Sequence, residues 1–531
     1  MSEITYFDAR CYLGRSLWTA EGQPTTVAAL LETMDHFGIH EALVLDSLCL
    51  ANNPKAGNAR ILRQTQGQPR LHPAWAYLLP HTRELPPPAE FVEQMRRCGV
   101  GAVYVFYGQY NLPLEDWAVD DLLSALQEAR VPLFLCPNDV TDPGRIDQTD
   151  WQGVVAICRR FPQLPVIVTE ERIYRSQRAM YAAMAACDNL ILDLSMIWLH
   201  KAVEFICREF GAARLVWSSR LPERTPGSPL MQLNYSDISE EELALIAGGN
   251  MRRLLSWNQN VRPAKDVRFA EPTDTLHRAA RERLPLSAEE FYDCHGHIGW
   301  GDPYHVVNET PEGLVAEMDK FGIRKALVFS IQIMGDAGYG IDEVAEMTQR
   351  WPERFIGLTL VNPRNGERQM MEDLKRGASL GMRGVKLMLN SYGAYDVNGP
   401  LVDVCARWAN ERREFILSHY WGPPERLLQL CRDNPQACFI VGHSYDCYSK
   451  VFEQVPNVFL CTCPFLAMGQ TERFTNIYGC DRILFGSDLM DLPIGWGIGQ
   501  IAYARIAEAD KRKILGGNLR ALMQKYSVAR R

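Results

Sequence analysis

Five side chains that commonly bind divalent metals occur in the second half of this 531-residue chain, each at or near the end of an apolar run. They are His295, His297, His419, His443 and Asp488. Because alternate residues of a strand point to one face, His295 and His297 are predicted to face the same interior. Imidazole and carboxylate ligands suit zinc, manganese, iron or cobalt. The pattern predicts one divalent metal ion, with zinc as the first expectation.

Short β-rich runs alternate with helix-length amphipathic segments around these residues. The runs cover residues 291–295, 326–330, 355–360, 384–389, 415–418, 438–441, 458–461 and 482–485. Thr310-Pro311 predicts a helix start, because a capping hydroxyl followed by Pro is typical of a first turn. Alternation of about eight such strands with helices predicts a parallel (β/α)8 barrel. The strand ends of such a barrel converge on its catalytic face, which would bring the five side chains together.

The first half of the chain repeats motifs of the second half in the same order. Phe37–Leu45 matches Phe321–Phe329, Arg214–Arg220 matches Arg482–Asp488, and Gly248–Asn250 matches Gly516–Asn518. The last two matches share one offset, which is hard to obtain by chance. The sequence therefore predicts an α/β fold of two tandem (β/α)8 TIM-like barrels. The expected domains are residues 1–260 and 288–531, joined by a linker at 261–287.

The metal-binding residues are absent from the matching positions of the first half. The alignment places Arg10 at His295, Tyr12 at His297, Tyr104 at Lys386, Pro137 at His419, Glu170 at His443 and Arg220 at Asp488. Guanidinium groups never deprotonate in proteins, so the first barrel is predicted to hold no metal and to be a scaffold, a regulator or a partner of the second site. Two enclosed cations need a counter-charge, so Glu170 is expected to pair with Arg10, with Arg220 or with both, near the vacated metal position. The alternatives are a bound anion, or ordinary loop charges in solvent.

The motifs of the second half resemble the amidohydrolase superfamily, and most closely its amidohydrolase-2 branch. The resemblance rests on Asp293 to Gly299, Gly384 to Lys386, the two later His residues, Phe485 to Asp488 and Gly516 to Asn518. It implies that His295, His297, His419 and Asp488 bind one metal and that His443 is the catalytic His. The family commonly has Gly after that His, whereas Ser444 follows here, which puts the usual pocket shape in doubt.

The implied chemistry acts on a small-molecule substrate. A metal with an open position makes water nucleophilic near neutral pH, with Asp488 accepting the proton and His443 polarising the substrate. We expect a metal-dependent hydrolase of an ester, lactone or amide bond in a small acid-type substrate. The alternatives are a non-oxidative decarboxylase of a small carboxylic acid and a non-catalytic, metal-containing binding protein.

Further residues near the same strand ends are candidate contacts. Lys386 is expected to bind a substrate carboxylate, to form an internal salt bridge, or to bridge two metals. In some branches of the superfamily, a carbamylated Lys on the fourth strand has this bridging role. Tyr392, Tyr420 and Tyr445 either line the pocket or pack the loops. Cys461-Thr462-Cys463 places two thiols on one strand face, which we interpret as a structural interior pair rather than a metal or redox site.

Composition limits the partners and the location of the protein. A net charge of −8 without a Lys/Arg block argues against nucleic acid. No secretory signal is visible, and no apolar run approaches the roughly 18 residues that span a bilayer. Fifteen Cys residues without a paired framework indicate reduced thiols in the cytoplasm. Because proteins of the resembled branch often form homodimers, the two barrels are expected to pack as a pseudo-dimer, with further oligomerisation left open.

Overall fold

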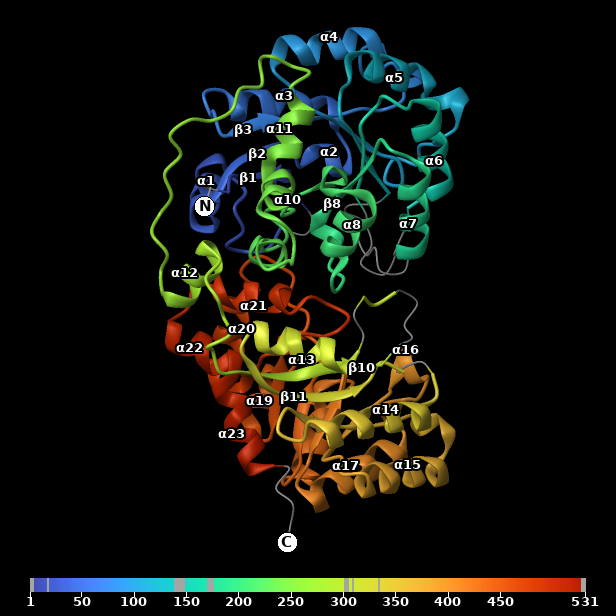
Figure 1. Ribbon diagram of the computed structural model, residues 1–531, viewed down its shortest axis with the longest axis vertical. Coiled ribbons are helices and arrows are strands. Elements are labelled where there is room, and N and C mark those ends of the chain that lie inside the picture. Colours follow the sequence, from blue (N-terminus) through green and yellow to red (C-terminus); the bar gives the residue numbers. More distant parts are fainter. Residues whose placement is uncertain are drawn as a thin grey trace. The chain divides into compact units, whose positions relative to one another are not determined.

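The chain folds into two compact units, Met1–Pro272 and Thr273–Arg531, which are each described separately (Figure 1). The computed structural model describes residues 4–16, 19–137, 149–169, 176–299, 305–307, 310–332 and 335–526. The division between the units falls inside the range 261–287 that was expected to be a linker. Within the described ranges, no helix combines the length and the apolarity needed to cross a bilayer.

Parallel strands form the barrel of the second unit. They are β10 (Phe291–Ile298), β11 (Ile323–Ser330), β12 (Phe355–Gly357), β13 (Thr359–Val361), β14 (Gly384–Leu387), β15 (Phe415–Ser418), β16 (Cys438–Val441), β17 (Val458–Cys461) and β18 (Ile483–Leu484). Each strand pairs in parallel with the next, except that Leu358 separates β12 from β13. A bridge between Gly296 and Leu489 and the hydrogen bond from Cys294 N to Phe485 O (2.8 Å) join the two ends of this series. With β12 and β13 taken as one interrupted strand, the sheet closes as a (β/α)8 barrel.

The first unit repeats this order. Its strands are β1 (Tyr6–Leu13), β2 (Ile39–Asp46), β3 (Leu71–Pro73), β4 (Trp75–Ala76), β5 (Val103–Phe106), β6 (Leu133–Cys136), β7 (Val166–Val168), β8 (Leu190–Asp193) and β9 (Leu215–Val216). Ala74 interrupts the series between β3 and β4, and a bridge between Cys11 and Leu221 joins its ends. The predicted fold of two tandem TIM-like barrels is confirmed.

Helices connect the strands of both barrels. In the first unit they are α1 (Val27–Phe37), α2 (Leu48–Ala51), α3 (Pro54–Thr65), α4 (Pro88–Cys98), α5 (Asp116–Ala129), α6 (Trp151–Arg160), α7 (Gln177–Ala186), α8 (Ala202–Phe210), α9 (Gly227–Asn234), α10 (Glu240–Ala244) and α11 (Asn250–Leu255). In the second unit they are α12 (Thr275–Glu282), α13 (Pro311–Lys320), α14 (Ala337–Arg350), α15 (Glu367–Ser379), α16 (Asn390–Gly393), α17 (Pro400–Arg412), α18 (Pro424–Asp433), α19 (Ser449–Gln454), α20 (Gln470–Tyr478), α21 (Ile494–Ala502), α22 (Glu508–Arg512) and α23 (Asn518–Lys525). The helix start predicted at Thr310-Pro311 is confirmed, because the Thr310 hydroxyl accepts from Gly313 N at the start of α13 (3.1 Å).

The repeated Gly-Gly-Asn motif has the same structural role in both units. A Cβ on Gly248 would lie 2.4 Å from Thr5 O, and a Cβ on Gly516 would lie 2.4 Å from Glu290 O, so each glycine permits close approach to the chain entering the first strand. Asn250 and Asn518 then donate side-chain hydrogen bonds of 2.8–2.9 Å to two carbonyls at the start of the last strand. The motif therefore anchors a π-helical turn to the closing strands in each unit.

The predicted linker range contains the helix α12, which packs on the second unit. Asp274 caps this helix by accepting from His277 N (2.8 Å). The same carboxylate accepts from Nζ of the fully buried Lys511 (2.7 Å), which also donates to Ala502 O (2.7 Å). A buried ion pair of this kind fixes α12 to the second unit, so the range 261–287 is not connector throughout.

Candidate metal centre

The ends of β10 and β18 are held together below the candidate site. The buried Asp293 carboxylate accepts from His295 N (2.9 Å), from Ser487 N (3.1 Å) and from the Ser487 hydroxyl. Asp488 N donates to His295 O (2.9 Å). Asp488 has φ 60°, a left-handed conformation that few residues other than glycine adopt. These contacts turn the chain after β18 so that Asp488 meets the two buried imidazoles of His295 and His297.

His295, His297 and Asp488 form a compact group of metal-binding atoms. Their ligand atoms lie within 4.8 Å of one another. Asp488 Oδ1 is 2.9 Å from His297 Nε2 and 3.4 Å from His295 Nε2. His295 Nε2 is buried without a hydrogen-bond partner among the described residues. Two imidazoles and a carboxylate at this spacing, with a buried nitrogen still to be satisfied, fit a divalent ion.

His419 and His443 follow β15 and β16 and face the same interior. The ring of His419 stacks on His295, with 5.4 Å between centroids, and on His443, with 4.2 Å. His419 lies outside the compact group, although it was expected to be a ligand. His443 is half-buried, and burial lowers its pKa to about 3. The structure thus brings all five predicted side chains to one end of the barrel, while the role of each residue stays a prediction.

Lys386 on β14 is fully buried in the second unit. Its Nζ is buried, 4.2 Å from the centroid of the Phe329 ring. No hydrogen-bond partner for Nζ occurs in the described part of the chain, so the internal salt bridge considered from the sequence is not found there. Burial lowers the pKa of Lys386 to about 7. The amine is therefore available to a ligand.

Burial and neighbouring charges shift the pKa values of all three residues of the compact group. Burial lowers the pKa of His295. Burial opposes protonation of His297 as well, but Asp491 and Asp488 outweigh it and raise the pKa of His297. Burial would raise the pKa of Asp488, yet the hydrogen bond with His297 and the nearby imidazoles hold that pKa well below its usual range. An ionised carboxylate beside imidazoles is the form in which these residues coordinate metals.

Asp491, which no sequence pattern predicted, also lies near this site. Its Oδ2 is 4.0 Å from His297 Nε2, so it contributes a second carboxylate to the surroundings of the imidazoles. It follows Asp488 closely in the chain, which is the only signal that the sequence carried for it.

Two of the candidate tyrosines border the same end of the barrel. Tyr420 and Tyr445 are half-buried and their ring centroids lie 5.3 Å apart. The neighbouring Tyr448 is buried and has a packing role, because its hydroxyl donates to Gly422 O (2.8 Å). Tyr392 belongs to α16, but its side chain lies outside the described part of the structure.

The first unit has charged and aromatic side chains where the second has its imidazoles. Arg10 is 1% exposed, and its Nε donates to the Tyr12 hydroxyl (2.8 Å) while Nη1 lies 3.3 Å from Asp193 Oδ2. Arg220 is 3% exposed, and its Nε donates to Glu223 (3.1 Å). The alternative that these arginines are solvent-exposed loop charges is therefore wrong. Glu170, their expected partner, lies outside the described residues.

Strand register corrects one position of the alignment between the units. Thr169 N donates to Leu135 O (3.2 Å) as Gly442 N donates to Ser418 O (2.8 Å). Thr169 stands directly before Glu170, and Gly442 directly before His443, so Leu135 matches Ser418. Cys136, rather than Pro137, therefore occupies the position of His419. Sequence similarity alone was too weak to fix the register of this short strand.

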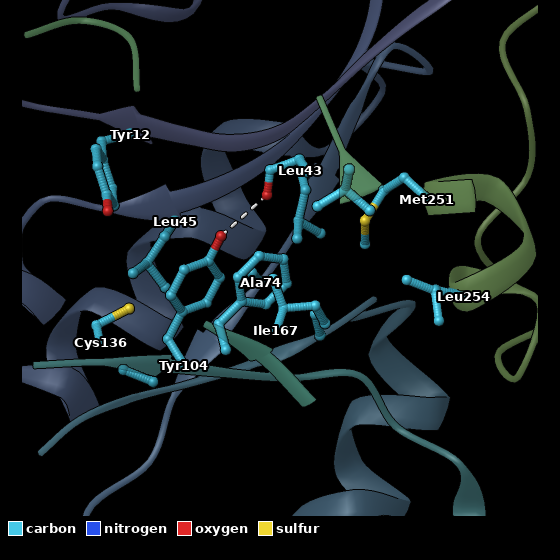
Figure 2. Packing of buried hydrophobic residues seen from close by; sticks show 14 of the residues in the cluster. Tyr12, Leu43, Leu45, Ala74, Tyr104, Cys136, Ile167, Met251 and Leu254 are labelled. Atoms are coloured by element: carbon cyan, nitrogen blue, oxygen red, sulfur yellow. Dashed lines mark hydrogen bonds between the residues drawn. The ribbon is translucent and has the colours of Figure 1, made fainter. Parts of the chain in front are cut away.

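Packing fills the interior of the first barrel. Tyr104, at the position of Lys386, is fully buried and its hydroxyl donates to Ala9 O (3.1 Å). Its ring stacks on Phe134 with 4.4 Å between centroids. Figure 2 shows Tyr104 in an apolar cluster with Leu45 and Ile167. An aromatic core thus replaces the polar interior of the second unit.

Comparison with known proteins agrees with this architecture. A family model described as "Amidohydrolase" matches residues 26–257 and again residues 292–523. The chain belongs to this amidohydrolase family. The double match confirms the tandem duplication, with one family domain in each half of the chain. A search of curated proteins gives no match.

Several solved structures are similar to part of this chain. An uncharacterised TIM-barrel protein from Bordetella bronchiseptica is 15% identical, with 45% of this chain and 99% of that chain covered and a TM-score of 0.37. A 2,6-dihydroxybenzoate decarboxylase from Rhizobium is 17% identical, with coverages of 44% and 99% and a TM-score of 0.35. A manganese-bound 5-carboxyvanillate decarboxylase from Novosphingobium aromaticivorans is 14% identical, with coverages of 45% and 98% and a TM-score of 0.35.

Proposed function

We propose that the second unit is a metal-dependent hydrolase of an ester, lactone or amide bond in a small organic acid. The observation that carries this proposal is the grouping of His295, His297 and Asp488 within 4.8 Å, beside His443. These three residues hold the metal, with His419 as a further ligand. Zinc is the expected ion, since it accepts imidazole and carboxylate ligands and keeps an open position. When bound, such an ion acts as a Lewis acid and makes water a nucleophile near neutral pH.

Three side chains around this centre have separate roles in proton transfer, charge stabilisation and substrate binding. Asp488 is ionised and takes the proton of the attacking water on a carboxylate oxygen. His443, which is half-buried and faces the same interior, donates a hydrogen bond to the substrate oxygen and stabilises the charge that develops there. Lys386 offers its buried Nζ to a carboxylate of the substrate, which orients the scissile bond.

The position of Lys386 also favours a second candidate reaction, non-oxidative decarboxylation. A carboxylate bound by Nζ would be the group that such a reaction releases as carbon dioxide. A proton from solvent would then replace carbon dioxide on the substrate carbon, passed on by the neutral imidazole of His443, which takes up one proton at one ring nitrogen as it gives another from the other. Both reactions use an acid-type substrate, and they differ in whether carbon dioxide is released.

Two variants test the proposal against a panel of lactones, amides and aromatic acids. Asp488→Asn is expected to lower turnover by about 10²–10⁴-fold, because an amide cannot take the water proton. His443→Ala is expected to lower turnover within the same range of about 10²–10⁴-fold and to keep the metal in elemental analysis. Undiminished hydrolysis by Asp488→Asn would contradict the assignment. Release of carbon dioxide without hydrolysis would replace it with the second reaction.

We also propose that the first unit is a structural partner of the catalytic unit. Its Arg10 is paired with Asp193, and Tyr104 fills the place of Lys386. A cation is repelled by this interior, because guanidinium groups keep their charge at every physiological pH.

A further inference from the structure

Cys461 contacts His295 on the side away from the other metal-binding atoms. Cys461 ends β17 and is fully buried, and its Sγ is 3.8 Å from His295 Nδ1. The other ring nitrogen, Nε2, is the one that lies 3.4 Å from Asp488. The imidazole is thus held between a sulfur on one nitrogen and the candidate metal position on the other.

Gly486 provides the room for this sulfur. A Cβ at position 486 would lie 2.3 Å from Cys461 Sγ and 2.9 Å from His295 Cβ. Neither approach is tolerated in a packed interior, so any larger residue would displace the thiol or the imidazole. The glycine and the cysteine are therefore matched to each other.

The first unit has a related contact made with different chemistry. Asp193 ends β8 opposite Val216, as Cys461 ends β17 opposite Leu484. Asp193 contacts Arg10, which occupies the position of His295 (3.3 Å). Ser218 occupies the position of Gly486, and its hydroxyl donates to Asp193. In each unit, the residue that ends the seventh strand of the barrel thus contacts a residue of the first strand. These pairs are Asp193 with Arg10 and Cys461 with His295.

We propose that Cys461 is a positioning residue that fixes the tautomer and the orientation of His295. Nδ1–H of His295 donates to the sulfur, and the lone pair of Nε2 is directed toward the metal. A metal-binding imidazole commonly donates its second N–H to a neighbouring group, which sets the tautomer. Cys461 itself does not touch the metal. This inference rests on the metal site of the proposed function and gives Cys461 a role beyond that of a structural interior thiol.

The test compares variants of the full chain in their affinity for zinc or manganese, measured by competition with a chelator. Cys461→Ala is expected to weaken binding by about 10–100-fold, the effect of losing such a partner. The matched control is Cys438→Ala, which removes a buried thiol from the same core cluster, in β16, and should leave affinity unchanged. Cys461→Ser keeps a hydrogen-bond acceptor and should recover part of the affinity.

Nitrogen-15 spectra of labelled histidines provide a second readout, with the His295 signals identified by their loss in His295→Gln. In the wild type, Nδ1 of His295 should carry the proton, and Cys461→Ala should mix the two tautomers. Wild-type affinity and an unchanged His295 spectrum in Cys461→Ala would overturn the positioning role while leaving the metal site intact. Complete loss of metal, as in His295→Ala, would make Cys461 a ligand and also overturn it. Absence of metal binding in the wild type would instead contradict the proposed function.

Discussion

The two units have the same backbone turn after the last strand, a corner of the barrel that carries different side chains in each unit. Asp8 and Asp293 each accept hydrogen bonds from a serine that follows the last strand, Ser219 or Ser487. The next residue has φ 62° in the first unit and φ 60° in the second, although it is Arg220 in one and Asp488 in the other. A duplicated scaffold has therefore kept its closing geometry after the residues presented by that geometry changed. Function therefore lies in a few side chains placed on a shared backbone frame.

Charge balance explains how both versions of the corner remain folded. A buried guanidinium is tolerated only beside a carboxylate, and Arg10 has Asp193 at 3.3 Å. Neutral His295 needs only a weak partner, and Cys461 meets that need at 3.8 Å. The exchange of His295 for Arg10 is thus accompanied by a matching exchange of Cys461 for Asp193.

Removing two imidazoles from the second unit should abolish its metal binding, which is the expected functional difference between the units. The double variant His295→Ala, His297→Ala is expected to reduce metal content from about one equivalent per chain to a trace, since too few ligands remain. Tyr12→Phe is the control in the first unit. Tyr12 is the residue that aligns with His297, and this variant removes only its hydroxyl. Elemental analysis checks both proteins. Full metal occupancy in the double variant would mean that the site lies elsewhere.

Breaking the ion pair of the first unit should destabilise that unit and leave the metal in place. Arg10→Ala leaves Asp193 buried without its cation, at a cost of about 3–5 kcal/mol. The double variant Arg10→Met, Asp193→Asn removes both charges and should recover most of the loss. Hydrogen exchange measured on peptides of each unit separates the two effects. Equal loss of protection in both units, or no recovery in the double variant, would contradict the ion-pair explanation.

Positions 218 and 486 align between the units and are occupied by Ser218 and Gly486. Exchanging the two residue types tests whether each one is required by the contacts of its own unit. Gly486→Ser should displace Cys461 or His295 and weaken metal binding by about 10-fold or more, worth about 1.4 kcal/mol. Ser218→Gly removes the hydrogen bond that the hydroxyl donates to Asp193 and the one that it accepts from Ser195 N (3.3 Å), each worth about 1 kcal/mol of stability, and should not affect the metal. Chelator competition and thermal unfolding measure the two effects. Unchanged affinity in Gly486→Ser would show that the space beside Cys461 is not needed.

Sequence reasoning predicted the parts of this fold that depend on local rules. The period of two in the first strand and the convergence of strand ends were enough to place His295, His297 and Asp488 together. Pro137 rather than Cys136 was aligned with His419, because strand register depends on pairing with distant strands rather than on local pattern. The contacts of Cys461 and Asp491 were missed for a related reason, since each depends on packing between segments without a spacing rule. The helix α12 was hidden by the charge and Pro content of its surroundings.

The smallest expected difference between the units is their response to acid. Glu41 is buried in the first unit, 2.7 Å from His72 Nε2, and accepts two hydrogen bonds from Arg252 (2.5 and 3.0 Å). The second unit has Lys325 at this position, where its Nζ donates to Pro352 O (3.1 Å). Only the first unit therefore has a buried carboxylate at this point of its second strand.

The pKa of Glu41 determines the direction of this effect. Burial would raise it, but the hydrogen bonds with His72 and Arg252 outweigh burial and lower the pKa. Because the unfolded chain then binds the proton more tightly, the stabilisation is complete at neutral pH and is lost as the pH falls through the folded-state pKa, which lies below the ordinary value for Glu. Glu41→Gln should cost about 1–3 kcal/mol at pH 7, and the gap from the wild type should close in acid. Protection factors of peptides covering β2, corrected for intrinsic exchange at each pH, measure this gap, with peptides of β11 as the control. A gap that stays constant down to pH 3 would mean that the carboxylate charge of Glu41 contributes nothing, and that the two units differ here in shape rather than in electrostatics.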